Sequence, residues 1–122
     1  MKRQGPEATT QAAILDGLAM LGIFAWRQNT LPTPIVRTVG GRREVKGFRP
    51  SPVRGVPDIL GVLPHTGRLL AIEVKAKYGK PSDDQRAFLD KLNANGALAI
   101  VARSWDDVAE ALKASADEIP WR

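Results

Sequence analysis

Two carboxylates on either side of a tight turn constrain this chain more than any other feature. Asp58 ends the run GVPD, and Glu73 follows fifteen residues later in the run IEVK. Residues 59–63 and 68–76 are apolar and strand-like, and the PHTG sequence between them is typical of a tight turn. A four-residue connection joins antiparallel neighbours, so the pattern predicts a β-hairpin.

The turn sets the register of this hairpin. If Pro64 pairs with Gly67, counting back along both strands places Asp58 opposite Glu73, and alternation places Lys75 on the same face as Glu73. Directly opposed residues have Cβ atoms roughly 4.5–5.5 Å apart, and two like charges there are destabilising without positive charge between them. A divalent cation would supply that charge, with Lys75 contributing part of it. The hairpin therefore predicts a metal site.

The residue types restrict which metal could bind. The chain has no cysteine and one histidine, which excludes a disulfide framework and a zinc site built from Cys and His. Any metal must be held mainly by oxygen, so Mg²⁺ or Mn²⁺ is the expected cofactor.

Length and hydropathy indicate one domain over residues 1–122. The sequence shows no signal peptide and no apolar run of membrane-spanning length. We expect a cytoplasmic protein.

The net charge of +5 is concentrated in one segment. Residues 27–54 contain seven basic residues and one acidic residue, whereas the remainder contains eleven basic and twelve acidic residues. A phosphate backbone is the expected partner of such a segment, although a solvated basic loop that only aids solubility is the alternative. Its position just before the carboxylate hairpin favours nucleic acid. The candidate contacts are Arg37, Arg42, Arg43, Lys46, Arg49 and Arg54, with Lys80 in the loop after the hairpin, where a plain surface role is equally compatible.

Periodicity and capping signals predict the remaining elements. Residues 29–54 are predicted to be a long loop or mobile hairpin, with residues 35–39 paired to 44–48. The residues 97–102 are continuously apolar, which predicts a buried central strand. The expected helices span residues 7–21, 82–95 and 104–114, and a further short strand spans residues 23–27. The unit of strand, helix and strand from Leu69 to Ala102 should be a right-handed parallel crossover, so the fold class is α/β with helices on a mixed sheet.

Three side chains near the hairpin have two interpretations each. Glu73 interrupts a strand that looks buried, yet with Lys75 it could form an ordinary ion pair on a wet sheet face. Glu7 lies on the helix stripe that faces the sheet, but the helix dipole alone favours an acidic residue in a first turn. Gln85 fits a capping box with Ser82, and it also lies on the stripe that could reach the cluster.

Three motifs together resemble the VRR-Nuc family of the PD-(D/E)XK nuclease superfamily. They are Gly55-x-Pro57-Asp58, then Ile72-Glu73-Val74-Lys75, then Ser82-x-x-Gln85. The element order fits the restriction-endonuclease-like αβββαβ(α) core of that superfamily, so the resemblance covers roughly residues 7–102. The basic stretch from Leu31 to Arg54 has no match in the family pattern.

The resemblance implies metal-dependent hydrolysis of phosphodiester bonds. Asp58, Glu73 and the backbone carbonyl of Val74 would hold Mg²⁺ or Mn²⁺, and Glu7 would complete the site directly or through water. Lys75 would orient or activate the attacking water, and Gln85 would orient this group or contact the phosphate.

Small stand-alone domains of this family resemble viral or mobile-element enzymes, some of which act as homodimeric resolvases on branched DNA. We therefore expect a structure-selective endonuclease for four-way (Holliday) junctions or other branched DNA, acting in DNA repair or resolution. A flap, nicking or restriction-like nuclease is one alternative. A non-catalytic nucleic-acid-binding module with the same fold is the other.

Overall fold

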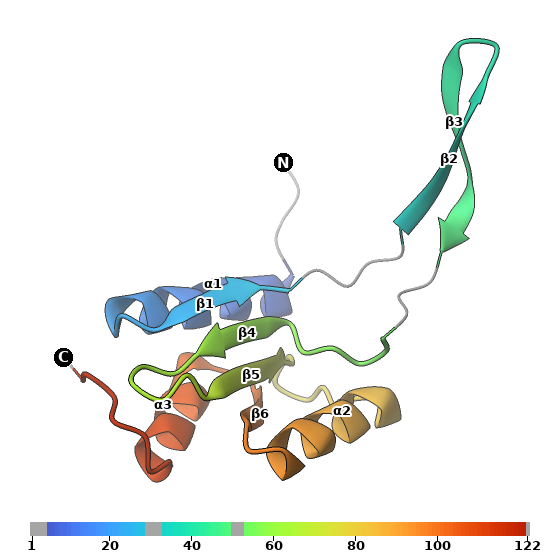
Figure 1. Cartoon of the computed structure of the whole chain (residues 1–122). Helices are drawn as coiled ribbons and strands as arrows, with labels where there is room; N and C mark the ends of the chain where they lie inside the picture. Colours follow the sequence, from blue (N-terminus) through green and yellow to red (C-terminus); the bar gives the residue numbers. More distant parts are fainter. Residues whose placement is uncertain (1–4, 29–32, 50–52, 122) are drawn as a thin grey trace.

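The chain forms three helices, a four-stranded sheet and a separate two-stranded hairpin (Figure 1). The structure is a computed structural model, and it describes residues 5–28, 33–49 and 53–121. In chain order the elements are α1 (Pro6–Met20), β1 (Phe24–Arg27), β2 (Thr33–Val39), β3 (Arg42–Arg49), β4 (Ile59–Val62), β5 (Leu69–Val74), α2 (Asp83–Ala94), β6 (Leu98–Ala102) and α3 (Trp105–Ala114). The predicted helices and strands are all present, with ends that differ by a residue or two.

The main sheet is mixed, with the strand order β1-β4-β5-β6. β4 runs antiparallel to both β1 and β5, whereas β6 runs parallel to β5 across the crossover through α2. The prediction of a central position for residues 97–102 is wrong, because β6 pairs only with β5 and forms an edge of the described sheet. Helices cover both faces of this edge strand and exclude water from it. The run of apolar residues in β6 therefore reflects burial under helices, and it does not require a neighbouring strand on each side.

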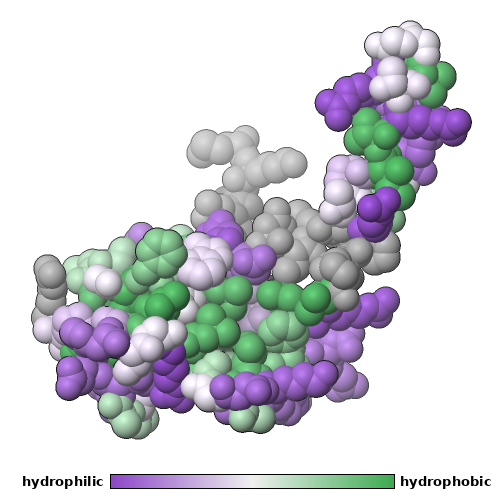
Figure 2. All heavy atoms as spheres, in the orientation of Figure 1, coloured by the Kyte–Doolittle hydropathy of each residue, from purple (hydrophilic) through white to green (hydrophobic). Residues whose placement is uncertain are grey.

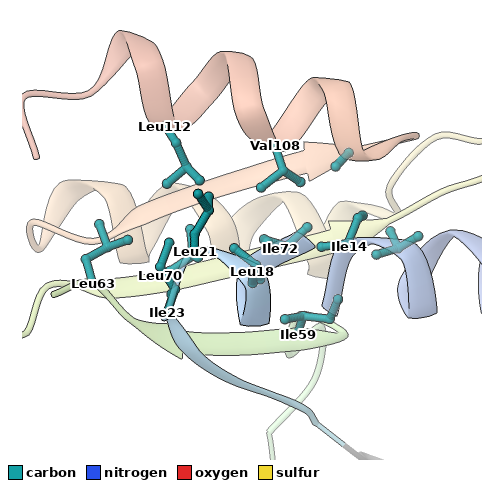
Figure 3. Packing of buried hydrophobic residues seen from close by; sticks show 12 residues of the cluster. Ile14, Leu18, Leu21, Ile23, Ile59, Leu63, Leu70, Ile72, Val108 and Leu112 are labelled. Atoms are coloured by element: carbon teal, nitrogen blue, oxygen red, sulfur yellow. The ribbon is translucent and has the colours of Figure 1, made fainter. Parts of the chain in front are cut away.

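Helices α1 and α3 cover one face of the sheet and form the main core (Figure 3). Ile14 and Leu18, one turn apart on α1, pack with Ile59 and Ile72 of the sheet and with Val108 of α3. Helix α2 covers the opposite face, where its buried Leu89 packs on the alanines of β5 and β6. The sheet therefore has two differently covered faces.

Local signals place the helix ends as expected. Pro6 occupies the first turn of α1, and Gly22 follows the helix with a φ of +70°, a conformation that glycine adopts without strain. Ser82 caps α2, and Ser104 caps α3 by accepting a hydrogen bond from the Asp107 N–H. No helix of the described residues is long and apolar enough to cross a membrane.

The basic segment contains an antiparallel hairpin, which we call the arm (β2 and β3, residues 33–49). The predicted pairing of residues 35–39 with 44–48 is confirmed, with a register shift between Ile35 and Val36 that leaves an extra residue on β3. The ends of the predicted loop, residues 29–32 and 50–52, lie outside the described residues. Figure 1 shows the arm extending away from the sheet and helices.

Candidate functional site

The hairpin of β4 and β5 has the register that the turn predicts. Ile59 pairs with Ile72 and Val62 with Leu69, so Asp58, which directly precedes β4, lies opposite Glu73. One Asp58 oxygen, Oδ2, accepts a hydrogen bond from the Val74 N–H at 2.9 Å. This bond fixes the Asp58 carboxylate against the end of β5.

Glu73 is the one acidic side chain within the core of the described residues, with 1% of its surface exposed. Its Oε1 accepts a hydrogen bond from Gln85 Nε2 at 3.0 Å and lies 3.5 Å from Lys75 Nζ. Its Oε2 is buried and has no hydrogen-bond partner among the described residues. A buried carboxylate oxygen without a partner costs free energy, so this atom marks a place where a proton or a cation would be stabilising.

The negative charges of Asp58 and Glu73 repel one another, which changes the pKa of Glu73. Burial, and after it the neighbouring Asp58 carboxylate, raise the pKa of Glu73 from 4.5 to about 8. The ammonium of Lys75 lowers this pKa, but its effect is smaller than the other two. Near neutral pH and without a bound cation, Glu73 therefore holds a proton, so the two facing carboxylates are not both charged.

This donor set fits a small divalent cation. Such an ion would place positive charge between Asp58 and Glu73 and would give Glu73 Oε2 a partner. The described residues contain no group of three or more His, Cys, Asp or Glu side chains arranged to hold a metal. Mg²⁺ commonly binds through one or two carboxylates and keeps several waters, so two carboxylates and a backbone carbonyl are a sufficient protein contribution.

Gln85 fills both of the roles that the sequence left open. Its side-chain Oε1 accepts a hydrogen bond from the Ser82 N–H at 2.9 Å, which completes the capping box of α2. Its Nε2 donates to Glu73 in the same conformation. The first turn of α2 thereby orients the buried carboxylate.

Substitutions at Ser82 and Gln85 should separate these roles. Ser82→Ala removes only the cap, so we expect a loss of about 1 kcal/mol in the free energy of unfolding and unchanged catalysis. Gln85→Ala removes the cap contact and the Glu73 contact, so we expect a similar loss of stability and a fall in kcat of about tenfold or more. Thermal denaturation and single-turnover cleavage measure the two effects. Equal kcat values for both variants would contradict the role of Gln85 at the site.

Gly55 holds α2 close to the hairpin. Its φ is +80°, and a Cβ atom there would lie 2.4–2.8 Å from backbone atoms of Asp84 and Gln85. No real Cβ atom is tolerated so close to backbone, so a side chain at this position must displace the first turn of α2. In the sequence Gly55 belongs to the Gly55-x-Pro57-Asp58 motif, and that motif does not predict this contact.

A pair of glycine substitutions should isolate that contact. Gly55→Ala is expected to reduce the free energy of unfolding by about 3 kcal/mol, because it adds a backbone clash to the strain of a positive φ. Gly67→Ala is the matched control, because Gly67 has a φ of +74° and nothing within 4 Å of its added Cβ. It should cost only about 1 kcal/mol. Chemical denaturation measures the free energy of unfolding of both variants. Equal losses would show that the close approach of Gly55 to α2 does not contribute to the effect of Gly55→Ala.

The two remaining predicted metal ligands, Glu7 and Val74, contribute less to the site than Asp58 and Glu73. Glu7 is exposed on the first turn of α1, and its Oε1 accepts a hydrogen bond from the Ala76 N–H at 3.4 Å, just beyond β5. It does not join Asp58 and Glu73 in a group of three carboxylates. The Val74 side chain is fully buried, so only its backbone can take part in a site.

The predicted nucleic-acid contacts divide between the arm and the body. Five of them lie on the arm, away from the carboxylates: Arg37, Arg42, Arg43, Lys46 and Arg49 (Figure 1). Lys46 is paired with Glu44 at 2.8 Å. Arg54 lines a groove along α2 with Phe88 and Lys91, and Lys80 is exposed in the loop before α2. The charged segment is therefore adjacent to the site in sequence, but its basic arm projects away from it.

Comparisons with known proteins show the family and the fold of this chain. A family model described as the VRR-NUC domain matches residues 25–106, which is more than half of the chain and includes Asp58, Glu73, Lys75 and Gln85 but not Glu7. No curated protein matches the chain. A solved structure described as a VRR_NUC domain aligns with a TM-score of 0.62 at 21% identity, covering 91% of this chain and 98% of that chain. A second, described as a VRR_NUC domain protein, aligns with a TM-score of 0.50 at 18% identity, covering 92% and 88%.

The structural likeness, at these identities, concerns the fold, which is α/β and consistent with the restriction-endonuclease-like class. The match of the family model extends over the hairpin of β4 and β5, which carries the facing carboxylates, and over α2 and β6. From this match we conclude that the chain belongs to the VRR-NUC family and has a nuclease-type function.

Proposed function

We propose that this chain is a divalent-metal-dependent DNA endonuclease of the PD-(D/E)XK type whose site is formed by Asp58, Glu73 and Lys75. The observation that carries the proposal is Glu73, a buried carboxylate with one unpartnered oxygen, which faces a second carboxylate and an ammonium group. A structural ion pair would need only Glu73 and Lys75. Asp58 accepts a hydrogen bond from the Val74 N–H, but an ion pair of Glu73 and Lys75 does not need the second negative charge that Asp58 brings to Glu73.

Each residue has a distinct role in this proposal. Asp58, Glu73 and the Val74 carbonyl would hold Mg²⁺ or Mn²⁺, with Glu7 acting through water at the margin. The chemistry that such an ion supplies is a lower pKa for bound water and compensation of charge on the phosphate. Lys75, 3.5 Å from Glu73, would orient the attacking water and neutralise the developing negative charge. Gln85 keeps the Glu73 carboxylate in place.

The proposed substrate is branched DNA, with four-way junctions as the first candidate, and the proposed active form is a homodimer. A four-way junction is resolved by two symmetric cuts, whereas one copy offers one site. A two-fold dimer would present two sites at a fixed separation. The basic arm supports a DNA partner because five cations on one projecting hairpin can neutralise phosphates outside the site.

A substrate panel tests the specificity. Labelled four-way junction, flap, single strand and linear duplex are incubated with the wild type in Mg²⁺ or Mn²⁺, and cleavage products are mapped. Preferred cutting of the junction at two symmetric positions supports the resolvase. Preferred cutting of the flap or of linear duplex would replace it with a flap, nicking or restriction-like nuclease.

A non-catalytic binding module is the second candidate function. Two carboxylates that face a phosphate backbone would weaken binding unless a cation compensates them, so a module that only binds gains nothing from Asp58 and Glu73. Salt-dependent binding of every substrate without cleavage in either metal would establish the module and exclude the nuclease.

Neutralising the tip of the arm should weaken DNA binding. We expect Arg42→Ala combined with Arg43→Ala to lower affinity for all substrates alike and to reduce the slope of log K against log salt concentration by about two. Fluorescence anisotropy in EDTA measures both quantities. Lys113→Ala, on α3, is a control that should leave the slope unchanged. An unchanged slope in the double variant would show that the arm does not contact phosphate.

A further inference from the structure

The two faces of the arm differ in chemistry. Alternation and the observed register place Pro34, Val36, Val45 and Phe48 on one face, which we call the apolar arm face. The pair of Thr38 and Arg43, next to the turn, ends this face with one cation. Arg37, Arg42, Glu44 and Arg49 lie on the other face, together with Ile35 and Val39. Phe48 is 64% exposed, and Figure 2 shows apolar side chains along the arm that no other part of the body covers.

An isolated two-stranded hairpin is only marginally stable in water. The principal contacts of β2 and β3 are with each other, not with the helices or the main sheet. Arg37, Arg42 and Arg49 on the other face suit DNA, whereas the side chains of Val36, Val45 and Phe48 gain nothing from phosphate. A separate partner for this apolar face would stabilise the arm.

A second apolar surface lies on the body, on the α2 side of the sheet. Helix α2 packs over β5 and β6, whereas Phe24 and Trp26 of β1 and Val62 of β4 remain exposed on that side. We call these three residues, with the half-buried Leu60, the open sheet face. Figure 2 shows apolar side chains gathered over β1 and β4. Phe24 is 71% exposed, which is unusual for a large aromatic side chain in a small domain.

We infer that the apolar arm face of one copy packs on the open sheet face of a second copy, and reciprocally, in a two-fold dimer. The arm points away from its own body in Figure 1, so it leaves its own open sheet face uncovered. Each copy thus presents one of each surface, which is the condition for an isologous interface. The inference rests on the homodimer proposed above and specifies its contact surfaces.

The two surfaces correspond in size. Pro34 and Val36 are two residues apart on β2, as are Phe24 and Trp26 on β1, so each apolar stretch spans about 7 Å along its strand. Reciprocal packing forms two such contacts in one dimer, so it buries twice the area of a single contact. Helix α2, which borders the open sheet face, carries three acidic and two basic residues and therefore does not repel the positive arm.

The dimer leaves the charged arm face outward. Arg37, Arg42 and Arg49 would then be available for DNA while the opposite face of the same hairpin is buried. One hairpin with two faces would thus serve two partners, a second copy and a phosphate backbone.

Light scattering at graded concentrations of the full chain, without DNA or metal, tests the inference. Val45→Thr with Phe48→Thr removes apolar surface from the arm, and Phe24→Ser removes it from the sheet. Each is expected to raise the dissociation constant of the dimer by about a hundredfold or more, because each loss is repeated at both symmetric contacts. Threonine retains the strand preference of the arm, so the hairpin itself is preserved.

Two matched controls make the result specific. Ile35→Thr with Val39→Thr removes comparable apolar surface from the charged arm face, where Ile35 is 43% exposed. Met20→Ser removes a side chain that is 71% exposed, like Phe24, but belongs to α1 on the other side of the sheet. Both controls should change the dissociation constant by less than about threefold.

Cross-linking tests the pairing of the two surfaces directly. The chain has no cysteine, so Val45→Cys and Val62→Cys can be prepared as separate single variants. A mixture of the two treated with a short bismaleimide should give a cross-linked heterodimer, and neither variant alone should do so efficiently.

Three results would overturn the inference. A wild type that stays monomeric at high micromolar concentration would overturn both this inference and the proposed homodimer. A dimer that is insensitive to the arm and Phe24 variants would overturn the inference alone. Arm variants that lower DNA affinity without changing the dimer constant would assign the apolar arm face to DNA instead. Metal-dependent cleavage is measured separately, so the nuclease proposal stands or fails on its own.

Discussion

Lys75→Ala is expected to lower kcat by at least about a thousandfold while the protein remains folded and binds DNA with nearly the wild-type affinity. The Lys75 ammonium lies 3.5 Å from Glu73 Oε1 and is mostly buried, so no other cation among the described contacts of Glu73 can replace it. Its charge would matter most when negative charge develops on the phosphate. A loss confined to kcat is the signature of such an interaction.

Two further variants serve as a control and a comparison for Lys75→Ala. Lys77→Ala removes an exposed ammonium that lies over the Tyr78 ring at 5.3 Å, and it should retain wild-type cleavage. Asp58→Asn should also abolish cleavage, and unlike Lys75→Ala it should weaken the binding of Mn²⁺ measured by calorimetry. Normal turnover by Lys75→Ala would show that the lysine is only the ion-pair partner of Glu73.

The metal-free protein is expected to lose stability as the pH rises from about 4.5 to about 8. The pKa of Glu73 is raised from 4.5 to about 8 in the folded state, by burial and then by Asp58. Between these values the folded protein binds a proton that the unfolded chain has released, so the free energy of unfolding falls with increasing pH. We expect a loss of roughly 3 kcal/mol, or about 10 °C in melting temperature, measured in EDTA.

Glu73→Gln should remove this dependence. Glutamine is neutral at every pH, so the variant should be more stable than the wild type at pH 8.5 in EDTA and inactive in Mg²⁺. Saturating Mg²⁺ should restore stability to the wild type at pH 8.5 and leave the variant unchanged, because only the charged carboxylate gains a partner. Parallel pH profiles of the two proteins in EDTA would contradict the assigned state of Glu73.

The pairing of Asp58 with Glu73 could be predicted because few quantities determine it. The PHTG turn fixes the hairpin register, and the strand period of two then determines which side chains share a face. The helix ends could also be predicted from the sequence, because Ser82, Ser104 and Gly22 act through short-range hydrogen bonds or backbone conformation.

Features that depend on packing between distant elements could not be predicted. The edge position of β6 depends on which strands join the sheet, and an apolar run does not contain that information. The sequence suggested that Gln85 serves either α2 or Glu73, whereas one planar amide serves both. The contact of Gly55 with α2 depends on the closeness of two backbones, for which a glycine is only an indirect signal. The contact of Glu7 with Ala76 likewise depends on the position of α1 on the sheet.

Whether Asp58 and Glu73 form a metal-dependent nuclease site is decided by cleavage of a labelled four-way junction by the wild-type chain, first with Mg²⁺ and then with EDTA. We expect phosphodiester cleavage in Mg²⁺ that stops when the metal is chelated and is absent from Asp58→Asn under identical conditions. Cleavage that continues in EDTA, or that is retained by Asp58→Asn, would contradict a metal-dependent site at the two facing carboxylates.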